Sequence, residues 1–398
     1  MNIIFLTIGK FDSINDKGIY ADLLREFKKK GHNLYVITPR EKRFELSTEH
    51  KQEEGVNFLR VKIGNITKTN LIEKGLSTIF IEHFFLVEIK KHFRNVKFDL
   101  ILYSTPPIFE KIVKYIKTKD EAKSYLLLKD IFPQNAVDLE IFRKKSLIYW
   151  FFRNKEKNLY KFSDHIGCTS EAGVQFILDN NPEISVAKVE VCPNSIDPIS
   201  FEADSGEKNV IRAKYGIPLS KTVLVYGGNI GKPQGINFII ECLKSNECNT
   251  EVYFLIVGSG VEFNKLKSIF DSEKIQNAQI LNYLPKEEYE KLISSCDVGL
   301  IFLDKRFTIP NSPARLLSYM QASMPILTAT DKSTDIGRIA EKEDFGYWCE
   351  SGDIESFNKN LNLICNKDRR TLMGNKARSY LDKFYTVEKT YEIIMKHF

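Results

Sequence analysis

Long apolar runs and paired cysteines are both missing from this chain. No uninterrupted apolar stretch approaches the ~20 residues that a membrane-spanning helix needs, so we expect no transmembrane segment. The seven cysteines are an odd number, and no two of them form a Cys-x-x-Cys pair. This spacing argues against a disulfide framework and against a zinc site. We therefore interpret the cysteines as buried thiols and expect no metal and no cofactor.

Signals for export and for nucleic-acid binding are missing as well. The start, MNIIFLTIGKFDS, has no charged n-region and no small-residue cleavage site, so we interpret it as a first β-strand and expect a cytoplasmic protein. The net charge of +6 is modest, and without zinc-finger spacing or an RNA-recognition signature it does not indicate a nucleic-acid partner. Basic clusters such as Arg143 to Lys145 leave two interpretations open, a solvated helix face or contact with an anionic membrane surface.

What the chain does contain is a regular alternation of strand-like and helix-like segments. Apolar runs such as DLILYSTPP and EVYFLIVGSG alternate with amphipathic segments such as IYADLLREFKKKG, which predicts parallel sheets covered by helices. A length of 398 residues exceeds what one core usually holds, so we predict an α/β protein with two doubly wound domains. The predicted boundaries are 1–196 for the first domain, 197–209 for a linker, 210–380 for the second domain, and 381–398 for a C-terminal helix that could pack back on the first.

The segment VLVYGGNIGKPQG has the composition of a phosphate-binding turn. An apolar run ends in Gly227 and Gly228, turns through Gly231 and restarts as the helical segment INFIIECLK. Glycines let backbone N–H groups approach an anion closely, and a helix N-terminus carries partial positive charge. This geometry suits a diphosphate. Since open α/β sheets bind ligands at the carboxyl ends of their strands, we expect the function to lie in a cleft between the two domains.

The order of the motifs resembles the retaining glycosyltransferases of family 4, which have the GT-B fold. The resemblance runs nearly end to end, through KGIYADLLREFKKKGHNLYVIT, DLILYSTPP, LLLKDIFPQNAVDLE, PNSID, VYGGNIGKPQG, FLIVGSG and NSPARLLSYMQASMPI. It looks closest to the bacterial enzymes that build O-antigens, capsules and exopolysaccharides. It implies an N-terminal domain that binds the acceptor and a C-terminal domain that binds a nucleotide-sugar, probable donors being UDP-linked hexoses or N-acetylhexosamines. The absence of an Asp-x-Asp sequence fits transfer without a divalent metal.

The resemblance implies a donor site in the C-terminal domain. Lys232 and Arg315 would stabilise the negative charge that develops on the β-phosphate when the nucleoside diphosphate departs. Ser312 is predicted to cap a helix that has Pro313 in its first turn. The implied donor-binding residues are Gly227, Gly228, Asn229, Gly231, Gln234, Gly258, Gly260, Tyr283, Leu284, Asn311, Ser312, Pro313, Ala314, Leu316 and Ser318.

Several of these positions depart from the family pattern. Asn229 and Gln234 stand where the family often has an arginine and a lysine, so the loop has lost charge that Arg315 could replace. Ser318 stands where the family commonly has a glutamate that accepts hydrogen bonds from the donor ribose, and Pro310 where it has a second acidic residue. A serine can accept a hydrogen bond but supplies no charge.

The acceptor half of the site is expected after the strands of the first domain. Asp130 would orient or deprotonate the acceptor hydroxyl, which requires a carboxylate within hydrogen-bond reach. Alternatively, Asp130 caps a helix or a turn. Gly18 is singled out because bulk in its loop would block the cleft. The implied acceptor-binding residues are Lys17, Gly18, Ser104, Thr105, Lys129 and Gln134.

The resemblance also bears on the acceptor and on two alternatives. Acceptors in these pathways are typically polyprenyl-diphosphate-linked saccharides, which implies peripheral contact with the inner face of the cytoplasmic membrane. The aromatic segment Ile79 to Phe93 could lie on such a surface or pack on the N-terminal sheet. A UDP-sugar 2-epimerase of the same fold would need no acceptor. A non-catalytic partner of an assembly complex is the other alternative, because charge is missing at Asn229 and Ser318.

Overall fold

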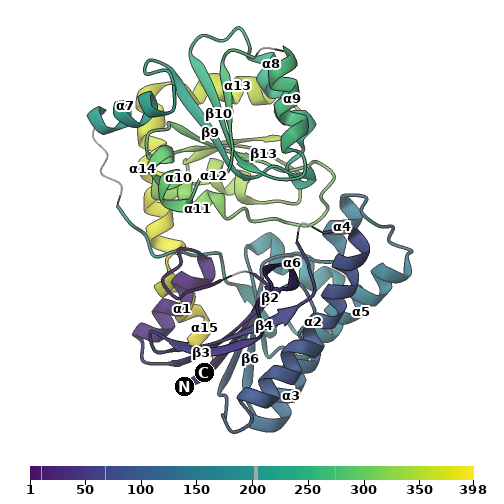
Figure 1. Cartoon of the computed structure of the whole chain (residues 1–398). Coiled ribbons are helices and arrows are strands. Elements are labelled where there is room, and N and C mark those ends of the chain that lie inside the picture. Colours follow the sequence, from purple (N-terminus) through teal and green to yellow (C-terminus); the bar gives the residue numbers. More distant parts are fainter. Residues whose placement is uncertain (10, 68, 201–204, 274) are drawn as a thin grey trace. The chain divides into compact units, whose positions relative to one another are not determined.

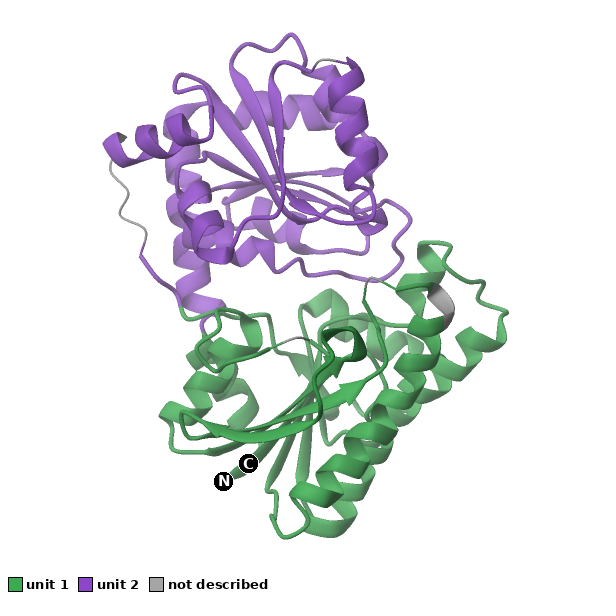
Figure 2. Ribbon diagram, in the orientation of Figure 1, with its two compact units in different colours: residues 1–197, 387–398 green, residues 198–386 purple. Residues whose placement is uncertain are grey.

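The chain forms two compact units, which are residues 1–197 with 387–398 and residues 198–386 (Figure 2). The computed structural model describes residues 1–398 except 10, 68, 201–204 and 274. Each unit has one sheet covered by helices (Figure 1). No helix within these described residues is both long and apolar enough to cross a bilayer. The predicted fold class, α/β with two doubly wound domains, is confirmed; the cleft between them stays a prediction.

Unit 1 is built on an eight-stranded sheet with the order β3-β4-β2-β1-β5-β6-β7-β8. Only the pairing of β3 with β4 is antiparallel. Strand β5 is buried along its whole length and β6 from Ser124 onward, as parallel strands covered on both faces require. Its elements are β1 (Asn2–Leu6), α1 (Ile19–Lys29), β2 (Asn33–Glu41), η1 (Lys42–Phe44), β3 (Glu49–Glu53), β4 (Val56–Ile63), α2 (Leu71–His92), β5 (Leu100–Ser104), α3 (Glu110–Asp120), β6 (Lys123–Leu128), α4 (Gln134–Asp138), α5 (Leu147–Phe162), β7 (His165–Cys168), α6 (Glu171–Asn180), η2 (Val186–Lys188), β8 (Val189–Val191) and α15 (Val387–Met395).

Unit 2 has a six-stranded, all-parallel sheet with the order β11-β10-β9-β12-β13-β14. Strands such as β12 and β13 are fully buried apolar runs. Its elements are α7 (Ser205–Lys214), β9 (Thr222–Asn229), η3 (Lys232–Gln234), α8 (Ile236–Ser245), β10 (Val252–Ser259), α9 (Phe263–Glu273), β11 (Ala278–Leu281), α10 (Lys286–Ser294), β12 (Val298–Phe302), α11 (Arg315–Gln321), β13 (Ile326–Thr330), α12 (Ile336–Lys342), β14 (Gly346–Glu350), α13 (Ile354–Ile364) and α14 (Lys367–Phe384).

Two segments differ from the predicted boundaries. Helix α7 begins inside the predicted linker, because Arg212 fastens it to the sheet through the Ser295 carbonyl (2.8 Å) and the Asp297 carboxylate (2.7 Å). Residues 201–204 of that linker lie outside the described part. At the other end, α14 continues to Phe384, and the last helix, α15, packs on α1 in unit 1, where the Tyr391 and Phe27 rings are 4.9 Å apart.

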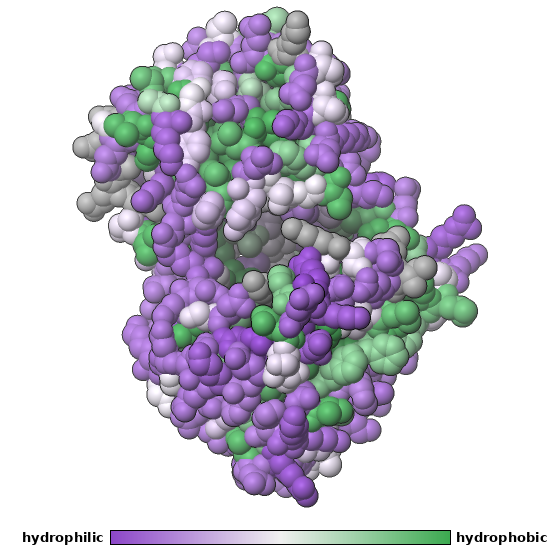
Figure 3. All heavy atoms as spheres, viewed as in Figure 1, coloured by the Kyte–Doolittle hydropathy of each residue, from purple (hydrophilic) through white to green (hydrophobic). Residues whose placement is uncertain are grey.

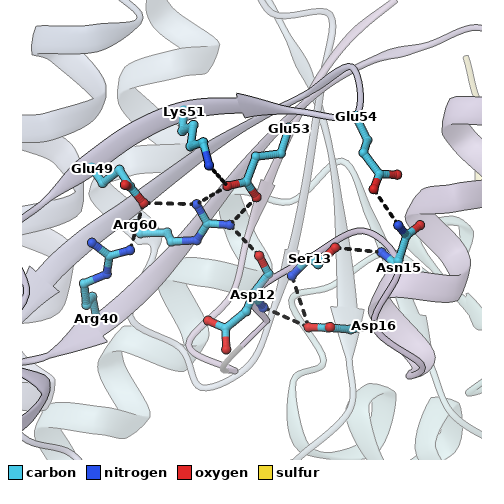
Figure 4. A network of polar contacts seen from close by, with 10 residues as sticks. All are labelled: Asp12, Ser13, Asn15, Asp16, Arg40, Glu49, Lys51, Glu53, Glu54 and Arg60. Carbon is cyan, nitrogen blue, oxygen red and sulfur yellow. Dashed lines mark hydrogen bonds and ion pairs between the residues drawn. The ribbon is translucent and has the colours of Figure 1, made fainter.

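A polar network around Arg60 holds the β3–β4 edge of unit 1 to the loop that follows β1 (Figure 4). Arg60 is 7% exposed and pairs with Glu49 (3.2 Å) and Glu53 (2.7 Å). It also donates to the Asp12 carbonyl and lies over the Phe58 ring, 4.7 Å from its centroid. One buried guanidinium therefore links a strand, a hairpin and a loop.

We expect Arg60→Met to lower the free energy of unfolding of unit 1 by about 2 kcal/mol, because it removes the charge-assisted hydrogen bonds from Arg60 to Glu49, Glu53 and the Asp12 carbonyl. Urea unfolding followed by circular dichroism measures this loss. Lys51→Met is the control, since Lys51 pairs with Glu53 (3.0 Å) from an exposed position and should change stability by less than about 0.5 kcal/mol.

The loss of stability in Arg60→Met should depend on pH. Hydrogen bonds from Arg40 and Arg60 hold the pKa of Glu49 and Glu53, respectively, below the ordinary value of 4.5. A carboxyl whose pKa is lowered by folding stabilises the fold above its ordinary pKa, and this stabilisation is lost as the pH falls through the folded pKa. The difference between wild type and Arg60→Met should therefore shrink below about pH 4.5. A difference that stays constant down to pH 3 would show that the ion pairs are not its source.

Candidate functional site

The glycine-rich loop of unit 2 lies where the carboxyl ends of β9 and β10 meet. Gly258 is paired with Gly228 in the sheet, and a Cβ added at Gly258 would lie 1.8 Å from the Gly228 carbonyl oxygen. A Cβ at Gly260 would lie 2.2 Å from the Ile230 carbonyl oxygen. Gly228 itself has a φ of 123°, which favours glycine. These glycines are thus required by close approach of the backbone, whatever the site binds.

Most backbone donors of this loop already have protein partners. The N–H of Gly227 donates to Tyr319 Oη (3.0 Å), and that of Gly231 donates to Gln234 Oε1 (3.1 Å). The N–H of Ile230 donates to the Ser259 carbonyl (2.9 Å). The expectation that the N–H groups of Gly227 and Gly231 face an anion is therefore wrong. Any charge for an anion at this loop has to come from side chains.

Arg315 supplies such a charge. It opens α11, and its Cζ lies 4.4 Å from the centroid of the Tyr226 ring at the end of β9. Its Nη2 would lie 3.6 Å from a Cβ built on Gly228. Its Nη1 is enclosed and has no hydrogen-bond partner among the described residues. Because an enclosed donor without a partner is costly, this nitrogen is the candidate contact for a ligand at the loop.

Tyr289 on α10 presents a second enclosed polar atom at the same loop. Its Oη has no hydrogen-bond partner in the described part of the chain, and it would lie 1.8 Å from a Cβ built on Gly227. Burial raises the pKa of Tyr289, and the neighbouring Tyr319 adds to the effect. Burial also raises the pKa of Tyr319 to about 12. Both hydroxyls are therefore neutral donors at physiological pH.

The three tyrosines at this loop, Tyr226, Tyr289 and Tyr319, are not predicted as site residues from the sequence. Tyr226 and Tyr319 are fully buried, and each lies within an apolar strand or helix, so their spacing predicts only core packing. Tyr289 lies in the charged helix KEEYEKLIS. Their common position at Gly227 and Gly228 comes from tertiary contacts between β9, α10 and α11, which no local pattern records.

The two neutral replacements in the loop interact with each other. Asn229 Nδ2 donates to Gln234 Oε1 at 3.2 Å, so the amide pair fixes the shape of the turn η3 and adds no charge. Lys232 lies in that turn with an exposed side chain. The cations that the structure brings to this edge of the sheet from the predicted set are thus Arg315 and Lys232.

The segment before α11 differs from its prediction. Helix α11 begins at Arg315 with Ala314 at its N-cap, so the predicted cap at Ser312 and the helical position of Pro313 are wrong. The preceding chain is held instead by the β13–α12 loop, where Thr334 Oγ1 accepts from the Asn311 N–H (3.1 Å) and donates to the buried Asp331 carboxylate (2.8 Å). The side-chain hydrogen bond of Asn311 goes to a backbone carbonyl (3.1 Å).

The other predicted donor residues are spread around this edge. Tyr283 is 68% exposed in the loop after β11, next to the half-buried Leu284. Ser318 is half-buried on α11. Leu316, by contrast, is 2% exposed and its side chain belongs to the interior of unit 2. Its N–H donates to the Pro313 carbonyl (3.1 Å), so neither group is open to a ligand.

Unit 1 brings most of the predicted acceptor residues to the carboxyl ends of β5 and β6. The N–H of Asp130 donates to Thr105 Oγ1 (3.1 Å), and the buried Ser104 Oγ donates to Thr7 Oγ1 (3.3 Å). Asp130 as a whole residue is exposed, but loss of hydration around its carboxyl raises the pKa of Asp130, and the charge of Lys129 offsets this in part. A raised pKa makes a carboxylate a stronger base.

Lys129 has a structural role in the same region. Its Nζ donates to the carbonyls of Pro193 (3.3 Å) and Cys192 (3.4 Å), and burial lowers its pKa. Its ammonium thus joins β6 to the segment that leaves β8. Gln134, at the start of α4, donates to Asp138 (2.7 Å).

The first loop places Lys17 and Gly18 just before α1. Lys17 is exposed, and a Cβ built on Gly18 meets no described atom within 4 Å. The φ of Gly18 is 164°, which is extended backbone open to any residue. Within unit 1, bulk at this position is therefore tolerated, and the effect of bulk at Gly18 on a cleft stays a prediction.

Comparison with known proteins identifies the chemistry of unit 2. Residues 207–380 match the family model described as glycosyl transferases group 1. This segment is similar to group 1 glycosyl transferases, and the chain is a glycosyltransferase. The matched residues include every predicted donor residue, from Gly227 to Ser318. The predicted enzyme class is thereby confirmed.

Relatives of this glycosyltransferase support the same class. The chain is 25% identical over 329 residues to the probable glycosyltransferase WbjE of Pseudomonas aeruginosa, covering 82% of this chain and 80% of that one. It is 22% identical over 163 residues to the putative colanic acid biosynthesis glycosyl transferase WcaI of Escherichia coli, covering 40% of this chain and 39% of that one. The structure of Anabaena HepE, solved with UDP and with UDP-glucose, matches with a TM-score of 0.72 at 13% identity over 100% of this chain and 99% of that one. The predicted GT-B fold is confirmed.

We expect Tyr289→Phe to raise the stability of the enzyme by about 1 kcal/mol, because it removes an enclosed hydroxyl that has no protein partner. Thermal unfolding of the unliganded protein measures this change. Tyr215→Phe is the matched control: Tyr215 Oη donates to Glu288 Oε1 (2.8 Å), so its removal should be neutral or destabilising. A destabilised Tyr289→Phe variant would mean that the hydroxyl has a partner after all.

Proposed function

We propose that the enzyme is a retaining, metal-independent transferase that moves a sugar from a UDP-sugar to a lipid-linked saccharide in the synthesis of a bacterial surface polysaccharide. The single observation that carries the donor half of this proposal is the pair of enclosed, unpartnered polar atoms, Arg315 Nη1 and Tyr289 Oη, at one glycine loop. A guanidinium and a hydroxyl that lack partners suit an oxygen-rich anion. The group that fits is the diphosphate of the donor.

The chemistry follows from where charge develops. When the glycosidic bond to the donor breaks, negative charge grows on the β-phosphate, and a cation already in place stabilises the transition state without reorganisation. Arg315 is held over Tyr226 beside Gly228, so it serves this purpose as a fixed charge. Lys232, exposed on the adjacent turn, adds a movable one. Both cations belong to the chain, and the proposed transfer therefore uses no divalent ion.

The acceptor half rests on Asp130. Asp130 follows β6, and loss of hydration raises the pKa of its carboxyl, as suits a group that accepts a proton from a sugar hydroxyl or orients it. Ser104, Thr105 and Gln134 would contact the acceptor at the same end of the sheet in unit 1. In a retaining enzyme a donor phosphate oxygen can take the proton instead, and Asp130 would then position the acceptor.

The names of the relatives support the donor and the pathway. HepE binds UDP and UDP-glucose in its solved structures, and WcaI is named for colanic acid biosynthesis. A UDP-linked donor and a polysaccharide product are the proposals that agree with both. A lipid-linked acceptor would bring the enzyme to the inner face of the cytoplasmic membrane as a peripheral protein.

We expect calorimetric titration in EDTA to show that UDP binds more tightly than ADP, GDP or CMP. Arg315→Ala should weaken UDP binding by about tenfold to a hundredfold, because hydrogen bonds to a charged group are lost. Arg369→Ala is the matched control. Arg369 pairs with Asp344 (2.6 Å), which precedes β14 and so lies at the amino end of the sheet. Its loss should leave UDP affinity unchanged.

The proposed donor site would be contradicted by a folded wild type that binds no nucleotide, or by an Arg315→Ala variant that binds UDP as well as wild type does. Tyr289→Phe adds a second criterion. If the Tyr289 hydroxyl binds the ligand, its removal should lower the affinity for UDP. The same substitution should make the unliganded protein more stable.

We expect Asp130→Asn to reduce sugar transfer by about 100-fold or more while UDP affinity stays within about twofold, because the carboxylate acts on the acceptor alone. Incorporation of radiolabelled sugar into a lipid extract measures transfer. Gln175→Asn, on the exposed α6 surface of the same unit, is the control. Turnover of a UDP-sugar in the absence of any lipid acceptor would favour the 2-epimerase instead.

A further inference from the structure

Helices α2 and α5 lie side by side on one face of unit 1 and expose apolar side chains along the same edge (Figures 1 and 3). At the start of α5, Leu147 is 88% and Trp150 is 63% exposed. The exposed apolar residues on the two helices are Leu76, Ile79, Phe80, Phe84, Val87, Leu147, Ile148, Trp150 and Phe151. We call these nine residues the α2–α5 surface. A soluble domain rarely gathers so many large apolar side chains in one place without a partner.

A groove of about 560 Å³ runs between the two helices and continues this surface inward. Its apolar wall includes Ile79, Phe80 and Phe151. Part of the charge in the wall is neutralised, since Lys155 pairs with Glu82 (2.8 Å) and Glu110 (3.8 Å), and Lys111 adds a further cation to the wall. The groove therefore combines apolar contact with basic groups.

Basic residues stand directly beside the apolar ones. Arg143, Lys144 and Lys145 are all exposed in the turn that leads into α5. None of them forms an ion pair with a described acidic residue. The Ser146 side chain caps α5 by accepting from the Tyr149 N–H (3.2 Å), which fixes where the basic turn ends and the apolar turn begins. Three cations are thus held next to Leu147 and Trp150.

Exposed apolar side chains next to exposed basic residues favour one kind of partner. Lysine is depleted in the buried parts of protein–protein interfaces, which disfavours a second copy of the chain as the occupant. Tryptophan with Lys and Arg is the composition of a surface that enters the headgroup region of an anionic bilayer, where the apolar groups insert and the cations face lipid phosphates.

We propose that the α2–α5 surface, together with Arg143, Lys144 and Lys145, docks on an anionic lipid bilayer, with the first turn of α5 inserted. This places the contact at the start of α5 and on the exposed side of α2, whereas Phe85, Ile89 and Phe93 of the segment Ile79 to Phe93 are buried in unit 1. This docking surface rests on the proposed function in one respect: a lipid-linked acceptor is presented at a membrane surface, which would explain why the enzyme binds one.

The test is co-sedimentation of the full chain with vesicles of phosphatidylcholine alone and of phosphatidylcholine with phosphatidylglycerol. Wild type should sediment with the anionic vesicles and not with the neutral ones. The double variant Leu147→Ser/Trp150→Ser should bind about tenfold more weakly or worse. The triple variant Arg143→Gln/Lys144→Gln/Lys145→Gln should also lose about tenfold or more, with a weaker dependence on salt.

Matched controls come from exposed residues of unit 2. Leu219→Ser/Val261→Ser removes two exposed apolar side chains, and Lys342→Gln/Lys359→Gln/Lys367→Gln changes the net charge by the same amount as the basic-turn variant. Both should bind anionic vesicles as wild type does. Equal melting temperatures for all variants exclude misfolding as the cause of lost binding.

Three outcomes would overturn the proposal. They are a wild type that does not sediment with anionic vesicles, variants that bind as wild type does, and a wild-type dimer that Leu147→Ser/Trp150→Ser disrupts, which would assign the surface to a second copy. UDP titration of the same preparations without vesicles keeps the two proposals separate. Lost UDP binding with retained vesicle binding would contradict only the donor site, and retained UDP binding with no vesicle binding would contradict only the docking surface.

Discussion

The unpartnered side of the Arg315 guanidinium is the constraint on which the C-terminal site depends. An enclosed hydrogen-bond donor is costly when it has no partner. The Arg315 side chain is half-buried, the Tyr226 ring covers one face of its guanidinium, and Nη1 has no partner among the described residues. We propose that the donor diphosphate supplies the missing acceptor. This leaves the enzyme with a charge that is fixed in place before any donor arrives.

The rest of the loop is arranged around this charge. The N–H groups of Gly227 and Gly231 donate hydrogen bonds to Tyr319 and Gln234, respectively. The Asn229 side chain donates to Gln234 as well. These hydrogen bonds fix the shape of the turn, and Lys232 is its exposed cation. Rigid, pre-placed groups are what transition-state stabilisation requires, and a single guanidinium in such a frame can replace charges that the family often places at positions 229 and 234.

The fold could be predicted from the sequence because its signals are local. Buried apolar runs ending in glycine or proline mark the central strands of both sheets, and β9 and β10 ended where the glycines predicted. The strand β3, with the sequence EHKQE, could not be predicted, since its pairing with β4 comes from the Arg60 network and not from an apolar pattern. The start of helix α7 could not be predicted, because Gly206 is typical of a linker. The helix is held to unit 2 by the buried Arg212, which pairs with Asp297.

The candidate site was predictable only in part, for the same reason. Glycines and Arg315 stand in motifs that can be recognised along the chain, but the Oη of Tyr289 reaches Gly227 from another helix. Likewise, Ser312 has the residue type of a helix cap, yet the link from Asp331 through Thr334 to Asn311 holds that segment in a non-helical form. Contacts between distant segments decide which polar atoms are left without a partner, and those atoms define the site.

The most direct test of this account is a comparison of UMP and UDP binding in wild type and in Arg315→Ala. The two nucleotides differ by one phosphate, the one on which charge develops during transfer. The account predicts that the variant loses about tenfold or more in UDP affinity, while its UMP affinity stays within about twofold of wild type. Equal losses for both nucleotides would show that Arg315 does not act on the β-phosphate, and the central claim would then be wrong.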